Sequence, residues 1–322
     1  MSAVARSLCA SRAGWPLLLL TALSGCGEPA APIAAPLLVF GKPGHGPVTF
    51  NYPRAMALTK DGVVIVDRSA RVQTLTRGGA YVREWRTPAS EAGKPTGVSV
   101  DADGNIYLAD THYAEVLVYS PTGELLKKFG EFGDGPGQFR LPTDVLVAPN
   151  GDIYVSEYGG NDRINRFTSD WEFVSSFGGP AAGDASLRRP QCMRIGPDGL
   201  LWVTDACAHR ICRFTLEGEF RGAFGSLGAE PGQFRFPYSM AFLSDGTIVV
   251  AEYGGSRLQH LDPTGKCLGT WGAPGRDPGQ LAFPWAVEVD ESDRVFVLDS
   301  GNNRVLVIAG LAEGTWGALA GG

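Results

Sequence analysis

The residues best suited to chemistry in this sequence are acids followed about five positions later by an arginine. A carboxylate and a guanidinium at this spacing can form charge-assisted hydrogen bonds, in a catalytic site or in a structural ion pair. The pair recurs along the chain, whereas a catalytic group is expected once, so we interpret it as a clamp between neighbouring strands. The pairs are Asp67/Arg71, Glu157/Arg163, Asp205/Arg210, Glu252/Arg257 and Asp299/Arg304. After Asp110, Glu115 stands where arginine is expected.

Each acid closes a longer phrase that occurs six times. A proline opens an alternating apolar run, a turn dipeptide such as Asp245-Gly246 follows, and a second run ends in the acid. The prolines lie 42 to 48 residues apart, at Pro53, Pro95, Pro142, Pro190, Pro237 and Pro284. A period of this size predicts an array of supersecondary units.

Each repeat predicts four strands. In the fifth repeat they are residues 238–243, 247–251, 258–261 and 267–271. The first hairpin turn carries Asp-Gly or Asn-Gly, which tolerate positive φ, at residues 61–62, 103–104, 150–151, 198–199 and 245–246. The fold class is therefore all-β, a six-bladed β-propeller of four-stranded antiparallel blades.

The two ends of the repeat array predict how it closes. Residues 37–41 match the rear half of a repeat, and the last repeat lacks a clear fourth strand after residues 305–308. We expect the N-terminal strand to complete the last blade, because an open array would expose apolar sheet at both ends. The propeller would span residues 37–308, followed by a Gly/Ala-rich tail at 309–322.

The first 36 residues predict export. Arg6 and Arg12 precede a short apolar run, and the sequence Leu23-Ser24-Gly25-Cys26 resembles a bacterial lipobox. That resemblance implies a signal peptide at 1–25, a lipid on Cys26 and a flexible tether at 26–36, which would place the protein in the bacterial cell envelope. The alternative is an ordinary secretory signal with a chance cysteine.

The repeated phrase resembles the NHL repeat. The third repeat carries it most clearly, in Leu141-Pro142-Thr143-Asp144-Val145, residues 151–155 and residues 163–167. The resemblance covers about residues 37–308 and implies the propeller fold. It implies little about function, because such propellers host unrelated activities.

The net charge of the chain restricts the classes of partner that it is expected to bind. The 322-residue chain has a net charge of −6, which becomes −8 without residues 1–25 and their two arginines. An acidic chain with no Lys/Arg stripe is a poor candidate for nucleic acid, and we expect membrane contact only through the lipid anchor. We expect a monomer.

Function is expected where the repeats differ. In a propeller, the start of strand one and the loop between strands two and three share one face, around the mouth of the central channel. Aromatic, polar and cationic residues at these positions would form a ligand pocket, although ordinary loop packing would explain them too. The candidates are Arg54, Arg68, His112, Tyr158, Asp162, His209, Tyr238, Tyr253 and Trp285.

One enzymatic alternative comes from a related family. Stretches such as Asp110-Thr111-His112 resemble peptidyl-α-hydroxyglycine α-amidating lyases, whose zinc ligands are histidines directly after the strand-one prolines. Those positions hold Arg, Thr, Thr, Gln, Tyr and Trp here. We therefore expect no metal and no cofactor, because zinc catalysis needs about three protein ligands.

The sequence leaves two points open. A disulfide within the fourth repeat is possible among Cys192, Cys207 and Cys212, with Cys267 as a further cysteine, but connectivity cannot be deduced. The favoured function is binding of a protein, peptide or glycan at the channel mouth. The alternative is a lyase- or lactonase-like enzyme with a site at the same mouth.

Overall fold

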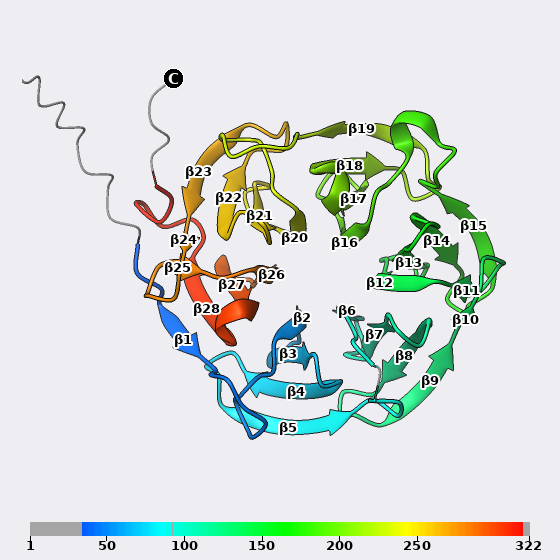
Figure 1. Ribbon diagram of the computed structural model, residues 1–322, viewed down its shortest axis with the longest axis horizontal. Helices are drawn as coiled ribbons and strands as arrows, with labels where there is room; N and C mark the ends of the chain where they lie inside the picture. Colours follow the sequence, from blue (N-terminus) through cyan, green and yellow to red (C-terminus); the bar gives the residue numbers. More distant parts are fainter. Residues whose placement is uncertain (1–33, 92, 318–322) are drawn as a thin grey trace, which may run out of the picture. The chain divides into compact units, whose positions relative to one another are not determined.

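The structure is a computed structural model that describes residues 34–91 and 93–317. Six four-stranded antiparallel sheets surround a central channel like blades (Figure 1). The first strand of each blade lies innermost, and the fourth lies at the rim. The chain is thus an all-β six-bladed propeller, which confirms the predicted fold class.

The strands follow the repeat in order. Blades 1 to 3 consist of β2 (Pro53–Leu58), β3 (Gly62–Asp67), β4 (Arg71–Thr76) and β5 (Tyr81–Arg86); β6 (Gly97–Val100), β7 (Ile106–Asp110), β8 (Glu115–Tyr119) and β9 (Leu125–Phe129); and β12 (Leu141–Val147), β13 (Ile153–Tyr158), β14 (Arg163–Phe167) and β15 (Phe173–Phe177). Blades 4 to 6 consist of β16 (Pro190–Ile195), β17 (Leu201–Asp205), β18 (Arg210–Phe214) and β19 (Phe220–Phe224); β20 (Pro237–Phe242), β21 (Ile248–Glu252), β22 (Arg257–Leu261) and β23 (Cys267–Trp271); and β26 (Pro284–Val289), β27 (Arg294–Asp299), β28 (Arg304–Ala309) and β1 (Leu38–Phe40).

Short elements complete the loops. They are the strand pairs β10 (Glu131–Phe132) with β11 (Gln138–Phe139) and β24 (Ala273–Pro274) with β25 (Gln280–Leu281), and the 3-10 turns η1 (Gly183–Ala185), η2 (Ala206–Ala208) and η3 (Ser300–Asn302). In the described part of the chain, no helix is long and apolar enough to cross a membrane.

The first hairpin turns follow the expected chemistry in most blades. Gly104, Gly151, Gly199 and Gly246 have φ between 74° and 87°, where a side chain would be strained. Gly62 differs, because it already belongs to β3 and a Cβ there would lie 2.2 Å from the carbonyl oxygen of Leu75. This glycine is needed for close approach of the neighbouring strand rather than for positive φ.

The core lies between the blades. One buried apolar cluster joins β21 and β22 of blade 5 to β27 and β28 of blade 6, and comparable clusters lie between the other neighbouring blades. The middle strands supply most of these side chains because both of their faces are covered, as in Ile248–Glu252, where every residue is buried. Each blade is therefore stabilised chiefly by its two neighbours.

The acid–arginine pairs hold the loops that join successive blades. In blade 5, Arg257 Nε lies 2.5 Å from Glu252 Oε1. The second carboxylate oxygen accepts a hydrogen bond from the backbone N–H of Arg235, and Arg257 donates to the carbonyl of Gln233. The pair thus fastens the incoming loop to its own blade as well as joining strands two and three.

The same arrangement recurs in four other blades. The nitrogen–oxygen distances are 3.0 Å for Arg71–Asp67, 2.6 Å for Arg163–Glu157, 3.0 Å for Arg210–Asp205 and 2.8 Å for Arg304–Asp299. Blade 2 differs. Asp110 and Glu115 are both buried there, and Lys128 Nζ of the outer strand lies 2.5 Å from Glu115 Oε2.

At the seam of the ring, β1 is the fourth strand of blade 6. It pairs antiparallel with β28 in the register Leu38↔Val307 to Phe40↔Val305. Beyond Ala309 the chain packs back on blade 5, where Trp316 stacks on His260 at 4.9 Å and Gly317 pairs with Thr270. The predicted signal peptide, Cys26 and most of the predicted tether lie outside the described residues.

Candidate functional site

A β-bulge stands at the start of the inner strand in five blades. The pairing with strand two slips directly after the proline, so the next residue has no partner in the ladder. Such a bulge redirects one side chain without ending the strand. The bulged residues are Arg54, Thr143, Gln191, Tyr238 and Trp285. Except for Thr143, they line the channel.

The residue before the proline is also unusual in four blades. It is large, and its φ is positive, at 50° for Tyr52, 64° for Arg189, 55° for Phe236 and 52° for Phe283. Such a conformation is uncommon for non-glycine residues and persists only where its surroundings enforce it.

Side chains of the preceding blade hold these strained residues in place. The N–H groups of Tyr52 and Arg189 donate to Asn303 Oδ1 and Asp162 Oδ1, each at 2.6 Å. Those of Phe236 and Phe283 donate to His209 Nδ1 at 3.2 Å and Ser256 Oγ at 3.3 Å. The four acceptors come from the loops after strand two, so each blade positions part of its neighbour's rim.

The flanking residues of blades 1, 4, 5 and 6 enclose a hollow of about 540 Å³ at the channel mouth. It is lined by Tyr52, Arg54, Arg68, Arg189, Phe236, Tyr238, Tyr253 and Trp285. Tyr238 and Tyr253 stack at 4.4 Å, and both rings lie nearly perpendicular to the ring of Trp285, at 5.1 and 5.5 Å. Tyr52 Oη lies 3.1 Å from Tyr253 Oη, so residues 201 positions apart meet here.

The arginines of this hollow differ from those of the clamps. Arg54 lies over the ring of Trp285 at 5.2 Å, and its Nε is buried without a hydrogen-bond partner among the described residues. Burial, together with the charge of Arg68, lowers the pKa of Arg54. Arg189 lies over Tyr158 at 4.7 Å and donates to Gln191 Oε1 at 3.3 Å. Within the described chain, none of the three forms an ion pair with a carboxylate.

A second hollow of about 370 Å³ shares Arg189 with the first. It is lined by Tyr158, Gly159, Gly160, Asp162, Arg188, Arg189 and Cys207. The two hollows are neighbours, with Arg189 between the one that Trp285 lines and the one at the loop after β13.

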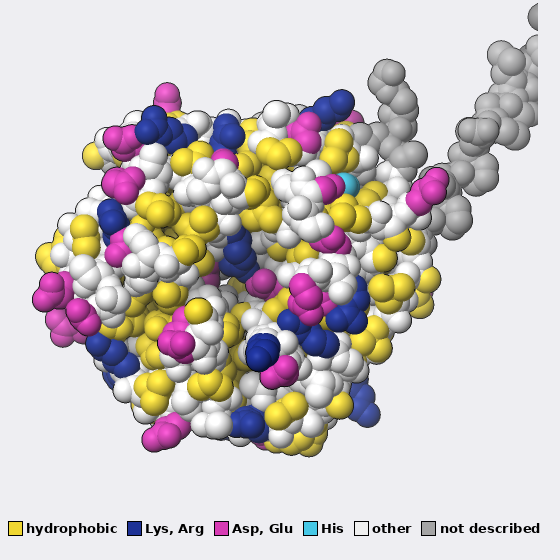
Figure 2. All heavy atoms as spheres, turned by 180° about the vertical axis from the view of Figure 1, so that it is seen from behind, with side chains coloured by type: hydrophobic (Ala, Val, Ile, Leu, Met, Phe, Trp, Pro, Cys, Tyr) yellow, Lys and Arg dark blue, Asp and Glu magenta, His cyan; other side chains and the backbone are white. Residues whose placement is uncertain are grey.

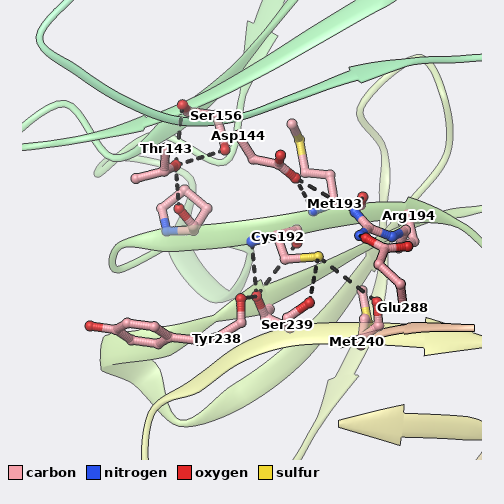
Figure 3. A network of polar contacts seen from close by, with 12 residues as sticks. Thr143, Asp144, Ser156, Cys192, Met193, Arg194, Tyr238, Ser239, Met240 and Glu288 are labelled. Atoms are coloured by element: carbon pink, nitrogen blue, oxygen red, sulfur yellow. Dashed lines mark hydrogen bonds and ion pairs between the residues drawn. The ribbon is translucent and has the colours of Figure 1, made fainter. Parts of the chain in front are cut away.

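Below the mouth the channel is nearly filled by side chains, which leave a space of about 30 Å³. Figure 3 shows how the inner strands of blades 3 to 6 are joined there. Asp144 Oδ2 accepts from the N–H of Met193 at 2.8 Å, and Arg194 forms an ion pair with Glu288. Burial raises the pKa of Asp144 to about 7, even though Arg194 opposes this shift. These side chains therefore nearly close the channel directly beneath the hollow.

Figure 2 shows one face of the propeller, where acidic and basic side chains are interspersed among apolar ones around a central depression.

Throughout the described residues, no three His, Cys, Asp or Glu side chains are grouped so that they could hold a metal ion.

The four cysteines in the described residues are free thiols. Cys192 Sγ faces the channel, 3.8 Å from Ser239 Oγ, while Cys212 Sγ lies 3.9 Å from Asp205 Oδ2. The disulfide that the sequence allowed within blade 4 is therefore not present. Burial raises the pKa of Cys192 to about 11, which keeps that thiol protonated.

The structure distributes the nine sequence candidates over different roles. Five line the main hollow: Arg54, Arg68, Tyr238, Tyr253 and Trp285. Tyr158 and Asp162 line the second hollow. His209 Nδ1 accepts a hydrogen bond from the N–H of Phe236, and the two side-chain rings are in contact. Burial lowers the pKa of His209, which favours the neutral form that can accept this hydrogen bond. His112 is exposed and lines neither hollow, and burial together with Lys94 and Arg54 lowers its pKa.

Sequence reasoning missed the residues before the prolines. Tyr52, Arg189 and Phe236 line the hollow, and Phe283 contacts Tyr253 at 5.2 Å. The available signal was a large side chain at the same repeat position in four repeats. It went unused because a residue before proline usually takes an extended conformation, which gave no reason to place it at the mouth.

A sequence profile of the NHL repeat matches residues 187–214 and 281–308. These stretches contain β16–β18 and β26–β28. Together with the six-bladed architecture, the match defines the chain as a β-propeller with NHL repeats.

Several known proteins are similar to this chain. Human NHL repeat-containing protein 3 is 26% identical over 167 residues, which is 45% of each chain. Rat peptidylglycine alpha-amidating monooxygenase is 31% identical over 97 residues, which is 28% of this chain and 10% of the relative. These alignments thus span less than half of either relative. A streptogramin B lyase structure superimposes with a TM-score of 0.61 at 17% identity, over 83% of this chain and 96% of the lyase, and this shows the fold alone.

Proposed function

We propose that this protein is a binding module of the bacterial cell envelope, anchored through a lipid on Cys26, which recognises a peptide segment of a partner protein at the channel mouth. The observation that carries the proposal is the hollow of about 540 Å³, where aromatic side chains and arginines from four blades converge. Concave, largely aromatic surfaces with a few polar groups are typical of ligand sites.

The strained backbone supports the same proposal. Four large residues with positive φ surround the hollow, and side chains of the neighbouring blade hold each of them. Each such residue costs on the order of 1–3 kcal/mol, and such residues cluster at binding and active sites. Phe236 and Phe283 remain 39% and 48% exposed, so the rim offers apolar surface to a ligand.

An enzyme is the second candidate, because the alignment with peptidylglycine alpha-amidating monooxygenase covers 97 residues at 31% identity. Its site would lie at the same mouth. The positions after the strand-one prolines hold no histidine in this chain, so the metal ligands expected of such a lyase are missing from them.

The test is binding by the purified protein to peptide and glycan arrays, with the variants Tyr253→Ala and Phe236→Ala. A matched control is Phe132→Ala, because Phe132 is an exposed aromatic outside the mouth. We expect peptide binding that both mouth variants weaken about tenfold or more and that the control leaves intact. Binding that survives both mouth variants, or turnover on a lyase and lactonase substrate panel, would overturn the proposal.

The anchor has its own test. Cells that express the protein should incorporate labelled palmitate into it, and Cys26→Ser should abolish the label. Labelling that persists in Cys26→Ser, or membrane release without lipid in the wild type, contradicts the anchor but leaves the mouth proposal standing.

A further inference from the structure

The hollow at the mouth offers hydrogen-bond donors in excess. Three of its eight lining residues are arginines, whose guanidinium groups only donate, and the others are aromatic. Among the residues that the structure describes, no carboxylate or carboxamide side chain lines it. The hydroxyls of a neutral sugar could accept from the arginines, but their own protons would find few acceptors here beyond the tyrosine oxygens. The complementary ligand is one that supplies acceptors.

The charge of the hollow is not balanced by the protein. Arg54 is half-buried over Trp285, and its Nε has no acceptor among the described residues. Arg68 is close enough for its charge to act on Arg54, and both line the same hollow. A buried or half-buried charge without a counterion is costly, so an anionic group that enters between these two arginines gains strong charge-assisted hydrogen bonds.

Several aromatic rings of the hollow are covered by other side chains, so few ring faces are free for a ligand ring to stack on. One face of Tyr253 covers Tyr238, and its ring also contacts Phe283. The guanidinium of Arg54 covers Trp285. Pyranose rings need a free aromatic face, whereas apolar peptide side chains can pack against the exposed edges of Phe236 and Phe283.

The arrangement of the two hollows also fits an extended chain. Arg189 lies between the main hollow and the second one, which Gly159 and Gly160 line. Both glycines have positive φ, near 96°, and a Cβ on Gly160 would meet only the side chain of Arg140. A peptide bound at Arg54 could therefore continue past Arg189 along this glycine-rich loop.

We infer that the mouth binds an acidic peptide segment, with a side-chain carboxylate between Arg54 and Arg68 and apolar neighbours against Phe236 and Phe283. This inference rests on the proposed function and adds the chemistry of the ligand. It follows that the affinity should fall as salt rises, because the contact is between opposite charges.

The test is a titration of the purified protein with pools of short peptides blocked at both ends and carrying fixed glutamates, against pools with glutamine in their place. Blocking removes the terminal carboxylate, so only side-chain charge differs. We expect the glutamate pool to bind about tenfold more tightly, because hydrogen bonds to charged groups are stronger than those to neutral groups. Arg54→Gln and Arg68→Gln should each remove most of this preference.

The control is Arg221→Gln, which removes a half-exposed arginine paired with Glu219 on the outer strand of blade 4. It should leave the preference unchanged. Equal binding of both pools, with Phe236→Ala still weakening it, overturns the acidic ligand but not the binding mouth. Tighter binding of an oligogalacturonate than of the glutamate pool overturns the peptide class. No binding of any of these probes at millimolar concentration overturns both proposals.

Discussion

Two groups of arginines in this propeller differ in the partners that the protein gives them. The clamp arginines, such as Arg257 and Arg304, each contact a buried carboxylate and the carbonyls of an incoming loop. The mouth arginines Arg54 and Arg68 have no carboxylate partner within the described residues and face a hollow. The clamps repeat in blade after blade, whereas Arg54 and Arg68 both come from blade 1, and Arg189 of blade 4 is the third arginine that lines the hollow.

The difference teaches where function lies in a repeat protein. A contact that every blade repeats stabilises the array, because each blade depends on its neighbours. A charge that one blade presents without a counterion does not stabilise the array in this way, and our proposal assigns it to ligand binding. Blade 2 lies between these cases, because Asp110 keeps the acid of the clamp while Glu115 replaces the arginine.

The largest effect is expected at the seam, where β1 pairs with β28. Deleting residues 37–41 removes β1, exposes the edge of β28 and takes the buried Phe40 from the core. We expect the melting temperature to fall by about 10 °C or more, and peptide binding to be lost with it. Differential scanning calorimetry measures the first effect.

The control for the seam is Val39→Thr, because Val39 is 44% exposed on the same strand. It should melt within about 3 °C of the wild type. A deletion variant that melts like the control would show that the ring does not need β1.

The next effect separates the two groups of arginines directly. Arg257→Gln leaves Glu252 buried with an uncompensated charge and removes the hydrogen bonds that Arg257 donates to the carbonyls of Ala229 and Gln233. We expect the free energy of unfolding to fall by about 3–5 kcal/mol, measured by guanidinium denaturation. Arg221→Gln, at an exposed pair, should cost no more than about 1 kcal/mol. Equal losses in the two variants would contradict the clamp.

Blade 2 predicts a pH dependence of stability, because its buried Asp110 has no arginine partner among the described residues. Burial and the neighbouring Glu115 raise the pKa of Asp110 to about 7, while Lys128 opposes this shift. Between about pH 4 and pH 7 the folded protein holds this proton and the unfolded chain releases it, so stability falls as pH rises. The limiting slope is about 1.4 kcal/mol per pH unit.

Asp110→Asn should remove this contribution. Denaturation curves at several pH values from 5 to 8 would then show the variant gaining stability relative to the wild type as pH rises. Asp144 titrates in the same range, and it is unchanged in the variant, so the difference between the two curves isolates Asp110. Parallel curves for the two proteins would mean that Asp110 is ionised throughout.

The smallest effect on stability is expected at the mouth. Arg54→Gln removes a cation that no carboxylate balances among the described residues, so no buried acid is left unpaired. We expect the free energy of unfolding to change by no more than about 1 kcal/mol in either direction, although peptide affinity falls. A loss as large as that of Arg257→Gln would make Arg54 a structural residue and remove the contrast between the two groups.

Much of the fold could be predicted because each repeat consists of local sequence patterns. The strands of blade 5 all begin and end within one residue of their predicted positions, since alternation and the Asp245-Gly246 turn depend on neighbours in sequence. The acid–arginine spacing likewise revealed the clamps, because both partners lie on adjacent strands. Gly62 was misread, since a close approach to Leu75 cannot be seen in a dipeptide.

The candidate site was predicted only in part. The residues after the prolines were recognised because they vary between repeats, and the bulge does turn Arg54, Tyr238 and Trp285 toward the mouth. Asp162 and His209 looked equally suited to a ligand. In the structure, both side chains accept hydrogen bonds from backbone N–H groups of the next blade, 27 residues away in sequence.

The sequence by itself determined the six-fold repeat, the all-β propeller and the clamp pairs, because each depends on spacing within one or two strands. Only the tertiary structure decided which side chains meet at the mouth. Tyr52 and Tyr253 touch although 201 residues separate them, and they do so because the ring brings blade 1 and blade 5 to one channel. The positive φ at Tyr52, Arg189, Phe236 and Phe283 is likewise enforced by neighbouring blades. A local pattern cannot encode contacts that exist only once the ring has closed.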